Sequence, residues 1–247
     1  MQIEGVVAFV TGANRGIGKQ FVEELQRAGA ARIYACARDT RALTEVASTD
    51  PERIVPIQLD TTNEKLVNDV AAHCQDVTLL INNAGVLHSQ GLIAAPDLTS
   101  ARAEMEVNYF GALLMCRAFA PVLKVNGGGA IINVLSILAR INYPPEGSYS
   151  ASKAAALSLT QGVRAELAPQ GTQVIAVMPG RVDTDMTKNE TVAKVSPSAV
   201  VAAALQAVLD GVEEVYPDDE SRGLAEQLAK DPKAVEKQIA RMLPTPS

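Results

Sequence analysis

The chain lacks a long apolar run, a block of basic residues and a spacing of histidines that would suit a metal. Apolar residues make up 47% of its 247 residues, but they come in runs of fewer than ten. Such runs are far too short to span a bilayer as a helix. Acidic residues outnumber basic ones by 28 to 22, which gives a formal net charge of -6. With no basic patch or stripe, a nucleic-acid partner is not expected.

Cysteine and histidine are both scarce. Cys36, Cys74 and Cys116 are odd in number, widely separated and set in apolar or helical stretches. This pattern indicates small buried thiols in a reducing compartment rather than disulfides. The two histidines, His73 and His88, complete no ligand spacing with them. We therefore expect no metal site and no catalytic cysteine.

Targeting and linker signals are also missing. The first residues, MQIEGVVAFVTG, place Glu4 where a signal peptide carries positive charge, and the apolar run enters a glycine-rich turn instead of a cleavage site. The longest turn-rich stretch, 142–148, is too short for a disordered linker, and no internal repeat occurs. We predict a soluble cytoplasmic protein with one domain over residues 1–247, including a charged, peripheral helical tail from about residue 218.

Short apolar runs alternate with stretches of helical period. We expect buried strands at 6–10, 32–36, 54–59, 77–81, 130–135 and 174–177, and an edge strand at 212–216. We expect helices at 16–28, 41–47, 64–74, 100–123, 148–167 and 219–242, with Asp39, Thr61 or Thr62, and Thr99 as N-caps. The alternation predicts an α/β fold with a parallel sheet covered by helices on both faces.

A glycine-rich motif, TGANRGIG at 11–18, follows the first predicted strand and opens the first predicted helix. In this context Gly12, Gly16 and Gly18 would let the backbone approach a pyrophosphate, and the helix N-terminus would add about 0.3–1 kcal/mol of favourable charge interaction. A tight structural turn is the alternative, and the glycines alone leave both interpretations open. In a doubly wound sheet, ligands bind beyond the carboxyl ends of the strands.

Tyr149 and Lys153 lie four residues apart in YSASK, downstream of Ser136 in NVLSI. Reduction of a ketone needs a proton for the carbonyl oxygen, and a tyrosine with a pKa of about 10 ionises reluctantly near neutrality. Lowering this pKa to about 7 takes roughly 4 kcal/mol. One ammonium at about 4 Å supplies an energy of that order at an effective dielectric constant of about 20. We therefore predict that Lys153, on the same helical face, lowers the pKa of Tyr149.

Simpler interpretations exist for each of these residues. Tyr149 and Lys153 could form a surface pair, Ser136 could cap the end of a strand, and Asn108 could satisfy buried backbone groups.

The spacing of the glycines, with three residues between the first two, resembles the TGxxxGxG motif of the short-chain dehydrogenase/reductase family. Further motifs of that family follow in order: Asp60 after the third strand, NNAG at 82–85, Asn108, Ser136, YxxxK at Tyr149 and Lys153, and PG at Pro179 and Gly180. The resemblance covers roughly residues 5–217. It implies a Rossmann-type doubly wound parallel sheet of about seven strands.

The resemblance also implies roles for residues of this chain. Tyr149 would be the general acid or base, Lys153 would also hold the nicotinamide ribose, and Ser136 would hydrogen-bond the carbonyl oxygen. Asn108 would help to hold a water that links the lysine to solvent. The implied cofactor-binding residues are Gly12, Asn14, Arg15, Gly16, Ile17, Gly18, Arg38, Asp60, Thr61, Asn83, Ala84, Gly85, Tyr149, Lys153, Pro179, Gly180, Val182 and Thr184. Asp60 would meet the adenine, while Asn83 has an equally plausible role in tying neighbouring strands together.

The end of the second predicted strand bears on cofactor choice. An acidic side chain there accepts hydrogen bonds from a ribose 2′-hydroxyl, whereas arginine pairs with a 2′-phosphate. NAD-selective members of the family tend to be acidic at the position that we align with Ala37, and Arg38 with Arg15 resembles the NADP-selective members. We predict NADP (NADPH) in preference to NAD. If the alignment shifts by one or two residues, Asp39 becomes the ribose ligand instead of a helix cap.

Together these features predict an NADPH-dependent carbonyl reductase that reduces a ketone or aldehyde reversibly. The expected pocket wall is mostly apolar, and the short loop 184–197 leaves it open to bulky uncharged substrates. Its expected residues are His88, Ile137, Leu138, Ile141, Tyr143 and Met186.

Two other functions stay open. A ketoacyl-acyl-carrier-protein reductase shares these motifs but would need a basic patch for its acidic partner. A non-catalytic NADP-sensing regulator would not need the tyrosine and lysine.

Apolar residues around much of the predicted helices 100–123 and 148–167 indicate a partner subunit. The resemblance implies a homodimer through these helices, and a homotetramer stays open.

Overall fold

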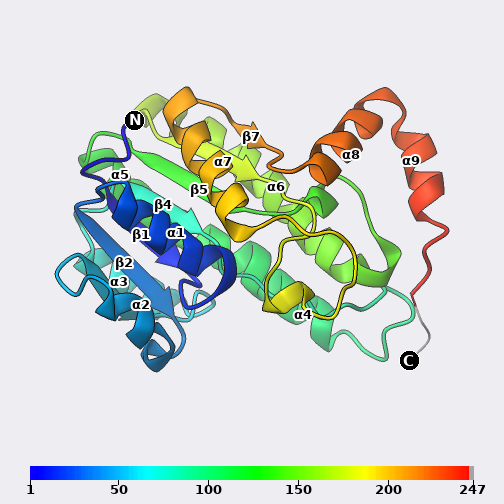
Figure 1. The fold of residues 1–247 in the computed structure, drawn as a ribbon, viewed down its shortest axis with the longest axis horizontal. Helices are drawn as coiled ribbons and strands as arrows, with labels where there is room; N and C mark the ends of the chain where they lie inside the picture. The colour runs from blue at the N-terminus through cyan, green and yellow to red at the C-terminus, as the bar shows by residue number, and fades with distance from the viewer. Residues whose placement is uncertain (245–247) are drawn as a thin grey trace.

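A computed structural model describes residues 1–244, which build a seven-stranded, all-parallel sheet in the order β3-β2-β1-β4-β5-β6-β7 (Figure 1). The strands are β1 Val7–Thr11, β2 Arg32–Ala37, β3 Ile54–Gln58, β4 Leu79–Asn82, β5 Ala130–Val134, β6 Gln173–Val177 and β7 Glu214–Val215. Each predicted run therefore supplies a strand, and the predicted doubly wound parallel sheet is confirmed. The edge strand β7 is shorter than expected.

Helices cover both faces of the sheet (Figure 1). They are α1 Gly16–Arg27, α2 Thr44–Ser48, α3 Glu64–His73, α4 Thr99–Met105, α5 Ala112–Val125, α6 Gly147–Leu167, α7 Pro197–Asp210, α8 Asp219–Lys230 and α9 Pro232–Ile239. Buried residues of α1, α2 and α7 pack on one face. Those of α3 and α5 pack on the other, together with partly buried residues of α6.

The helix α7 is absent from the sequence-based expectation. Its sequence, PSAVVAAALQAVLD, is apolar around most of its circumference, so it has no clear amphipathic period. The sequence nonetheless carries residues that are typical of the two ends of a helix. The Ser196 hydroxyl accepts a hydrogen bond from the Ala199 amide, Pro197 occupies the first turn, and Gly211 follows in the left-handed conformation at φ 74°.

Three helix boundaries differ from the predictions. Asn63, not Thr61 or Thr62, caps α3 by accepting a hydrogen bond from the Leu66 amide. Thr99 is the first residue of α4 rather than its cap, and its amide donates to Asp97. The predicted helix 219–242 is two helices, because Pro232 has no amide proton to continue α8 and Asp231 caps α9 instead. Asp39 does cap the 3₁₀ turn Thr40–Leu43 (η1) that precedes α2.

The predicted helix 100–123 is a continuous helical segment of three parts. A π-helical turn, Glu106–Gly111 (η2), joins α4 to α5. Such turns insert an extra residue into a helix and redirect the side chains on it. Asn108 lies in this turn and is buried.

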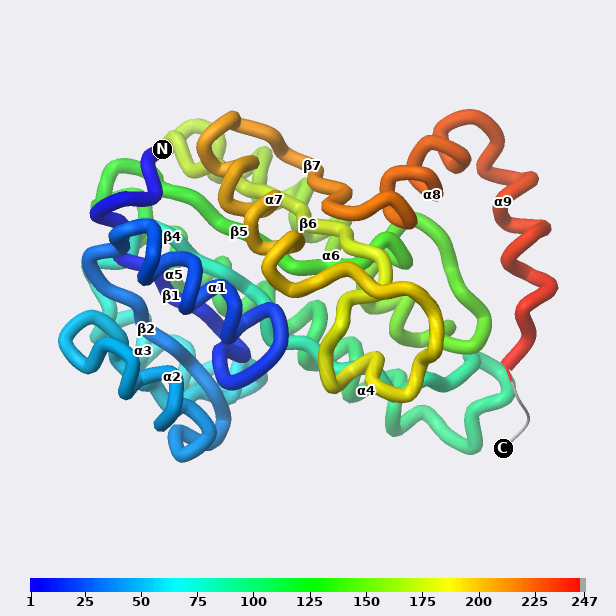
Figure 2. Tube along the Cα trace, viewed as in Figure 1, coloured from blue at the N-terminus to red at the C-terminus, as the bar shows by residue number. Residues whose placement is uncertain are grey.

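The tail after β7 leaves the layered body and then returns to it (Figure 2). It was expected to be peripheral, but both of its ends touch other loops. The Asp218 carboxylate accepts a hydrogen bond from the Gly180 amide at 2.9 Å. At the other end, a Cβ added to Gly91 would lie 2.8 Å from Pro244 Cγ.

Burial is extensive at the centre of the sheet. Phe9 on β1 and Phe119 on α5 are fully buried, with ring centroids 4.7 Å apart. The three cysteines are also buried, and burial raises the pKa of the Cys74 and Cys116 thiols to about 12. Among residues 1–244, no helix combines the length and apolar character that crossing a membrane requires.

Replacing Phe119 with alanine should destabilise the fold by about 3–5 kcal/mol, because it removes a fully buried ring and leaves a cavity. Val125 lies in the same helix but is 83% exposed, so Val125→Ala should change the free energy of unfolding by less than about 0.5 kcal/mol. Denaturant unfolding of both variants measures the difference. Similar losses in the two would contradict the assignment of Phe119 to the core.

Candidate active site

A cleft of about 430 Å³ opens at the carboxyl ends of the central strands. The chain leaves β1 towards β2 on one side and leaves β4 towards β5 on the other, so the loops diverge there. Predicted site residues on its lining are Gly12, Asn14, Arg15, Gly16, Ile17, Arg38, Asp60, Thr61, Asn83, Ala84, Gly85, Tyr149, Lys153, Thr184 and Met186. The structure therefore brings the glycine turn and the YxxxK motif to one cavity.

Other predicted residues do not line this cleft: Gly18, Asn108, Ser136, Pro179, Gly180 and Val182, and the expected wall residues His88, Ile137, Leu138, Ile141 and Tyr143. Lining residues that sequence analysis missed include Leu59, Thr62, Val86, Val134, Leu135 and Asp185. Val134 ends β5, and Leu59 and Leu135 directly follow β3 and β5. This is a usable signal, since the carboxyl ends of parallel strands share one edge of the sheet.

The glycine turn is closely packed. Gly12 has a φ of 64°, and a Cβ there would lie 3.0 Å from the Asn83 side chain. A Cβ on Gly18 would lie 2.1 Å from the Gly12 carbonyl oxygen. Gly18 therefore serves the packing of α1 against the turn, while Gly12 keeps the floor of the cleft free of side chains.

Thr11 and Asn83 join the ends of β1 and β4. The Thr11 hydroxyl donates to the Ile81 carbonyl at 3.2 Å and accepts from the Asn83 and Ala84 amides at 2.9 and 3.0 Å. The Asn83 side chain donates back to the carbonyls of Thr11 and Gly12, at 2.9 and 3.2 Å. Asn83 thus ties the two strands together and also lines the cleft.

Asn108 holds the loop that follows β4. Its Oδ1 accepts from the Val86 amide at 2.9 Å, and its Nδ2 donates to the Val86 carbonyl at 3.0 Å and to the Ser152 hydroxyl at 2.9 Å. One turn earlier, Glu104 Oε1 accepts from the His88 amide at 2.8 Å. The two side chains fix this loop against α6.

Tyr149 and Lys153 lie in the first turns of α6, and both are buried. Lys153 Nζ donates to the Val134 carbonyl at 3.0 Å and lies 5.6 Å from the centroid of the Tyr149 ring. Ser136 follows β5, and its hydroxyl accepts from the Leu138 amide at 3.2 Å, which caps a short 3₁₀ turn.

The prediction that Lys153 lowers the pKa of Tyr149 to about 7 does not hold in this structure. Burial raises the pKa of Tyr149 above its usual value, and the nearby Glu146 carboxylate raises it further, while the Ser136 hydroxyl lowers it. Burial also lowers the pKa of Lys153 to about 8. Desolvation disfavours the charged form of both groups, and it outweighs the attraction that we expected between them.

Near the second strand, Arg38 lines the cleft and Asp39 does not. The Asp39 carboxylate instead pairs with Arg41, with Nη2 2.8 Å from Oδ2. The structure therefore favours Asp39 as a cap. Arg15 also lines the cleft, and its exposed side chain pairs with Asp185 at 3.3 Å.

Asp60 lines the cleft beside these arginines. Its Oδ1 accepts from the amide and hydroxyl of Thr62, at 3.0 and 2.7 Å. The amide hydrogen bond is the main cause that lowers the pKa of Asp60. Within the described part of the chain, no three His, Cys, Asp or Glu side chains gather as a possible metal site.

The chain matches one protein family and is similar to proteins from three organisms. The family described as short chain dehydrogenase matches residues 6–194. A solved short chain dehydrogenase of Burkholderia cenocepacia in complex with NADP is 49% identical, with a TM-score of 0.92 over 99% of this chain and 100% of that one. A short chain dehydrogenase of Monascus purpureus is 35% identical over 81% of this chain and 73% of its own length. A 3-oxoacyl-[acyl-carrier-protein] reductase of Synechocystis is 31% identical over 74% of this chain and 76% of its own length.

Replacing Asn108 with alanine should destabilise the protein by about 1–3 kcal/mol, because it leaves the polar groups of Val86 and Ser152 without their partner. Glu106 lies in the same π-helical turn but is exposed, so Glu106→Ala serves as the control. Thermal unfolding checks both. If Asn108→Ala unfolds together with the control, the hydrogen bonds of Asn108 do not support this loop.

Proposed function

This chain belongs to the short-chain dehydrogenase family, and on that premise we propose that it is an NADP-dependent carbonyl reductase. The reaction is the reversible reduction of a ketone or aldehyde to an alcohol. One observation carries the proposal: Tyr149 and Lys153, both buried, line the same cleft as the glycine turn. A proton donor thus faces the cavity whose floor suits a phosphate.

Several features of the cleft fit NADP. The glycine turn presents backbone without side chains at the N-terminus of α1, which suits a pyrophosphate. Arg38 directly follows β2 and Arg15 lies in the glycine turn; both line the cleft, where their guanidinium groups would pair with a 2′-phosphate. The similar protein of Burkholderia cenocepacia is in complex with NADP, which supports the same choice here. When bound, NADPH supplies the hydride.

The residues of this chain supply the proton and the polar groups that surround the carbonyl oxygen. Because burial raises the pKa of Tyr149, its phenol is protonated at neutral pH and donates a proton to the oxygen of the carbonyl. Ser136 does not line the cleft itself, but its hydroxyl lies within hydrogen-bonding reach of Tyr149, and from there it would orient that oxygen. The pKa of Lys153 is about 8, so its ammonium is present at neutral pH and is lost as the pH rises through that value. The charged lysine stabilises the phenolate that proton transfer leaves behind.

A second candidate is reduction of a ketoacyl group on acyl carrier protein. The observation that favours it is the 31% identity to a 3-oxoacyl-[acyl-carrier-protein] reductase. The net charge of -6 opposes an acidic partner. Comparing kcat/KM for a ketoacyl group on the carrier and on a short free thioester separates the two functions. A strong preference for the carrier-bound form would favour the second candidate.

We extend the proposal to assembly and location. α4, α5 and α6 would form the interface of a homodimer, in keeping with the exposed Phe110 between α4 and α5, and the enzyme would act in the cytoplasm. A homotetramer stays open.

Replacing Tyr149 with phenylalanine should reduce carbonyl turnover at least about 100-fold, since it removes the proton donor and keeps the ring. NADPH affinity should change little. Tyr109→Phe is the control, because Tyr109 lies outside the cleft lining. Steady-state NADPH oxidation and NADPH binding by fluorescence measure the two effects. If Tyr149→Phe turns over the carbonyl as fast as the control, Tyr149 is not the proton donor. A non-catalytic sensor would instead show no turnover in either variant and unchanged NADPH binding in both.

Replacing both Arg15 and Arg38 with alanine should lower kcat/KM for NADPH by at least about 100-fold, at about 1.5–3 kcal/mol for each lost charge-assisted contact. Activity with NADH should fall far less. Arg41→Ala is the control, since Arg41 pairs with Asp39 and does not line the cleft. Equal losses with both cofactors would contradict recognition of a 2′-phosphate by these arginines.

A further inference from the structure

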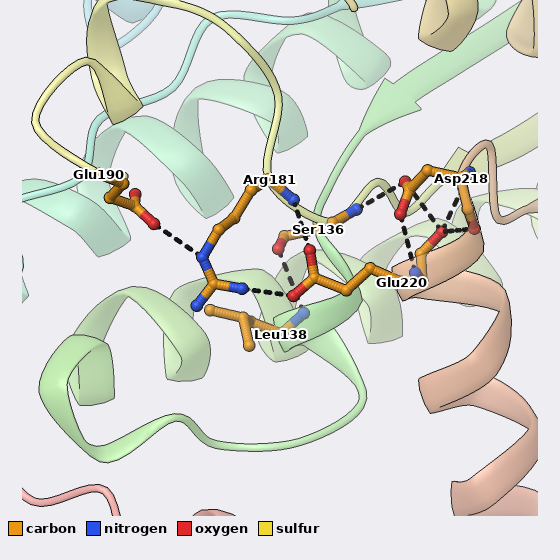
Figure 3. A network of polar contacts seen from close by, with 8 residues as sticks. Ser136, Leu138, Arg181, Glu190, Asp218 and Glu220 are labelled. Atoms are coloured by element: carbon orange, nitrogen blue, oxygen red, sulfur yellow. Dashed lines mark hydrogen bonds and ion pairs between the residues drawn. The ribbon is translucent and has the colours of Figure 1, made fainter. Parts of the chain in front are cut away.

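We propose that Arg181 is a positioning residue that fastens the loop over the cleft to the first turn of α8. The part of the proposal that concerns substrate binding rests on the proposed function. The loop, residues 182–195, contributes Thr184, Asp185 and Met186 to the lining of the cleft. Arg181 precedes it and contacts both the loop and the tail (Figure 3).

On the loop side, Arg181 fixes two separate points. Its Nε donates to Glu190 Oε2 at 2.7 Å. Its carbonyl accepts from the Val195 amide at 2.8 Å, and the Asp183 amide donates to the Val195 carbonyl at 2.8 Å. The backbone contacts close the base of the loop, and the side chain holds its middle.

On the tail side, the acidic start of α8 meets the same residue. The Arg181 guanidinium pairs with Glu220 through Nη1, and the Arg181 amide donates to Glu220 Oε2 at 3.3 Å. Next to it, the Gly180 amide donates to Asp218 Oδ2 at 2.9 Å, while Asp218 Oδ1 caps α8 by accepting from the Ser221 amide at 2.8 Å. One carboxylate therefore both starts the helix and anchors the loop.

The close approach depends on Gly180. A Cβ there would lie 2.8 Å from both Asp218 Oδ1 and Glu220 Oε2. With a larger residue at this position, the Asp218 and Glu220 carboxylates would have to shift away. Pro244, close to Gly91, lies beyond α9, so the tail approaches the rest of the chain at both of its ends.

Arg181 lies between two partly exposed carboxylates, those of Glu190 and Glu220, and it pairs with both. Its side chain is 32% exposed, and those of Glu190 and Glu220 are 32% and 44% exposed. Burial raises the pKa of the half-buried Glu146, the Glu190 carboxylate raises it further, and the charge of Arg181 partly offsets this. Without the guanidinium, Glu190 and Glu220 would lose their partner and the loop would lose its link to the tail.

The consequence concerns substrate binding more than proton transfer. Arg181 does not line the cleft. Its guanidinium carbon lies 6.0 Å from the centroid of the Tyr143 ring, which is also outside the lining. Loosening the loop would displace Thr184 and Met186 while Tyr149 and Lys153 stay in α6. We expect a higher KM for the carbonyl with a smaller change in kcat.

Two neighbouring carboxylates of α8 offer a matched test. Glu220→Ala removes the partner of Arg181, whereas Asp219→Ala removes a carboxylate of the same turn that pairs with Arg222. Trypsin cleavage after Lys188, an exposed residue of the loop, reports loop opening without any assay of activity. Cleavage in the full chain should be about tenfold faster for Glu220→Ala than for Asp219→Ala or the unaltered protein. Equal rates in the two variants would overturn the proposal.

Kinetics supply the second readout. Arg181→Met and Glu220→Ala should each raise the carbonyl KM about three- to tenfold, with kcat within about twofold. A loss of kcat at unchanged KM would overturn the positioning role. If the protein reduces no carbonyl at all, the proposed function fails, and the proteolysis result still decides whether Arg181 fastens the loop.

Discussion

The join between the carboxyl ends of β1 and β4 is the constraint on which the rest of the site depends. The Thr11 hydroxyl and the Asn83 amide close this join with buried and half-buried hydrogen bonds, and the glycine turn packs directly above it. Because the chain leaves the two strands in opposite directions, the cleft opens at this point. Tyr149 and Lys153 reach the same cleft from α6, and Arg38 reaches it from the end of β2.

Burial governs the chemistry of that cleft. It raises the pKa of Tyr149 and lowers the pKa of Lys153, so each group is driven towards its uncharged form. A protonated phenol suits a proton donor, and this favours the reductive direction of the proposed reaction. The nearby Glu146 reinforces the effect, and burial raises its own pKa to about 6. The Val134 carbonyl holds the Lys153 ammonium while these forces act on it.

The sequence predicted the layers of the fold, and its motifs indicated part of the cleft lining, because both follow from local patterns. Apolar runs marked each strand, and ordered motifs marked Gly12, Tyr149 and Lys153. It could not predict α7, whose apolar circumference conceals the helical period, or the π-helical turn that contains Asn108. The balance between burial and charge at Tyr149 depends on packing that no spacing encodes. Likewise, nothing in the acidic residues Asp218 and Glu220 indicated that they would meet Gly180 and Arg181, about forty residues away in the chain.

The central claim is that this chain transfers a hydride and a proton to a free carbonyl. Its most direct test is NADPH oxidation, with NADH in parallel, against aryl ketones, ketoesters, aldehydes and a ketoacyl thioester. The account predicts that NADPH is consumed with free carbonyl compounds and that one alcohol forms for each NADPH. Binding of NADPH without its consumption by any member of the panel would contradict it.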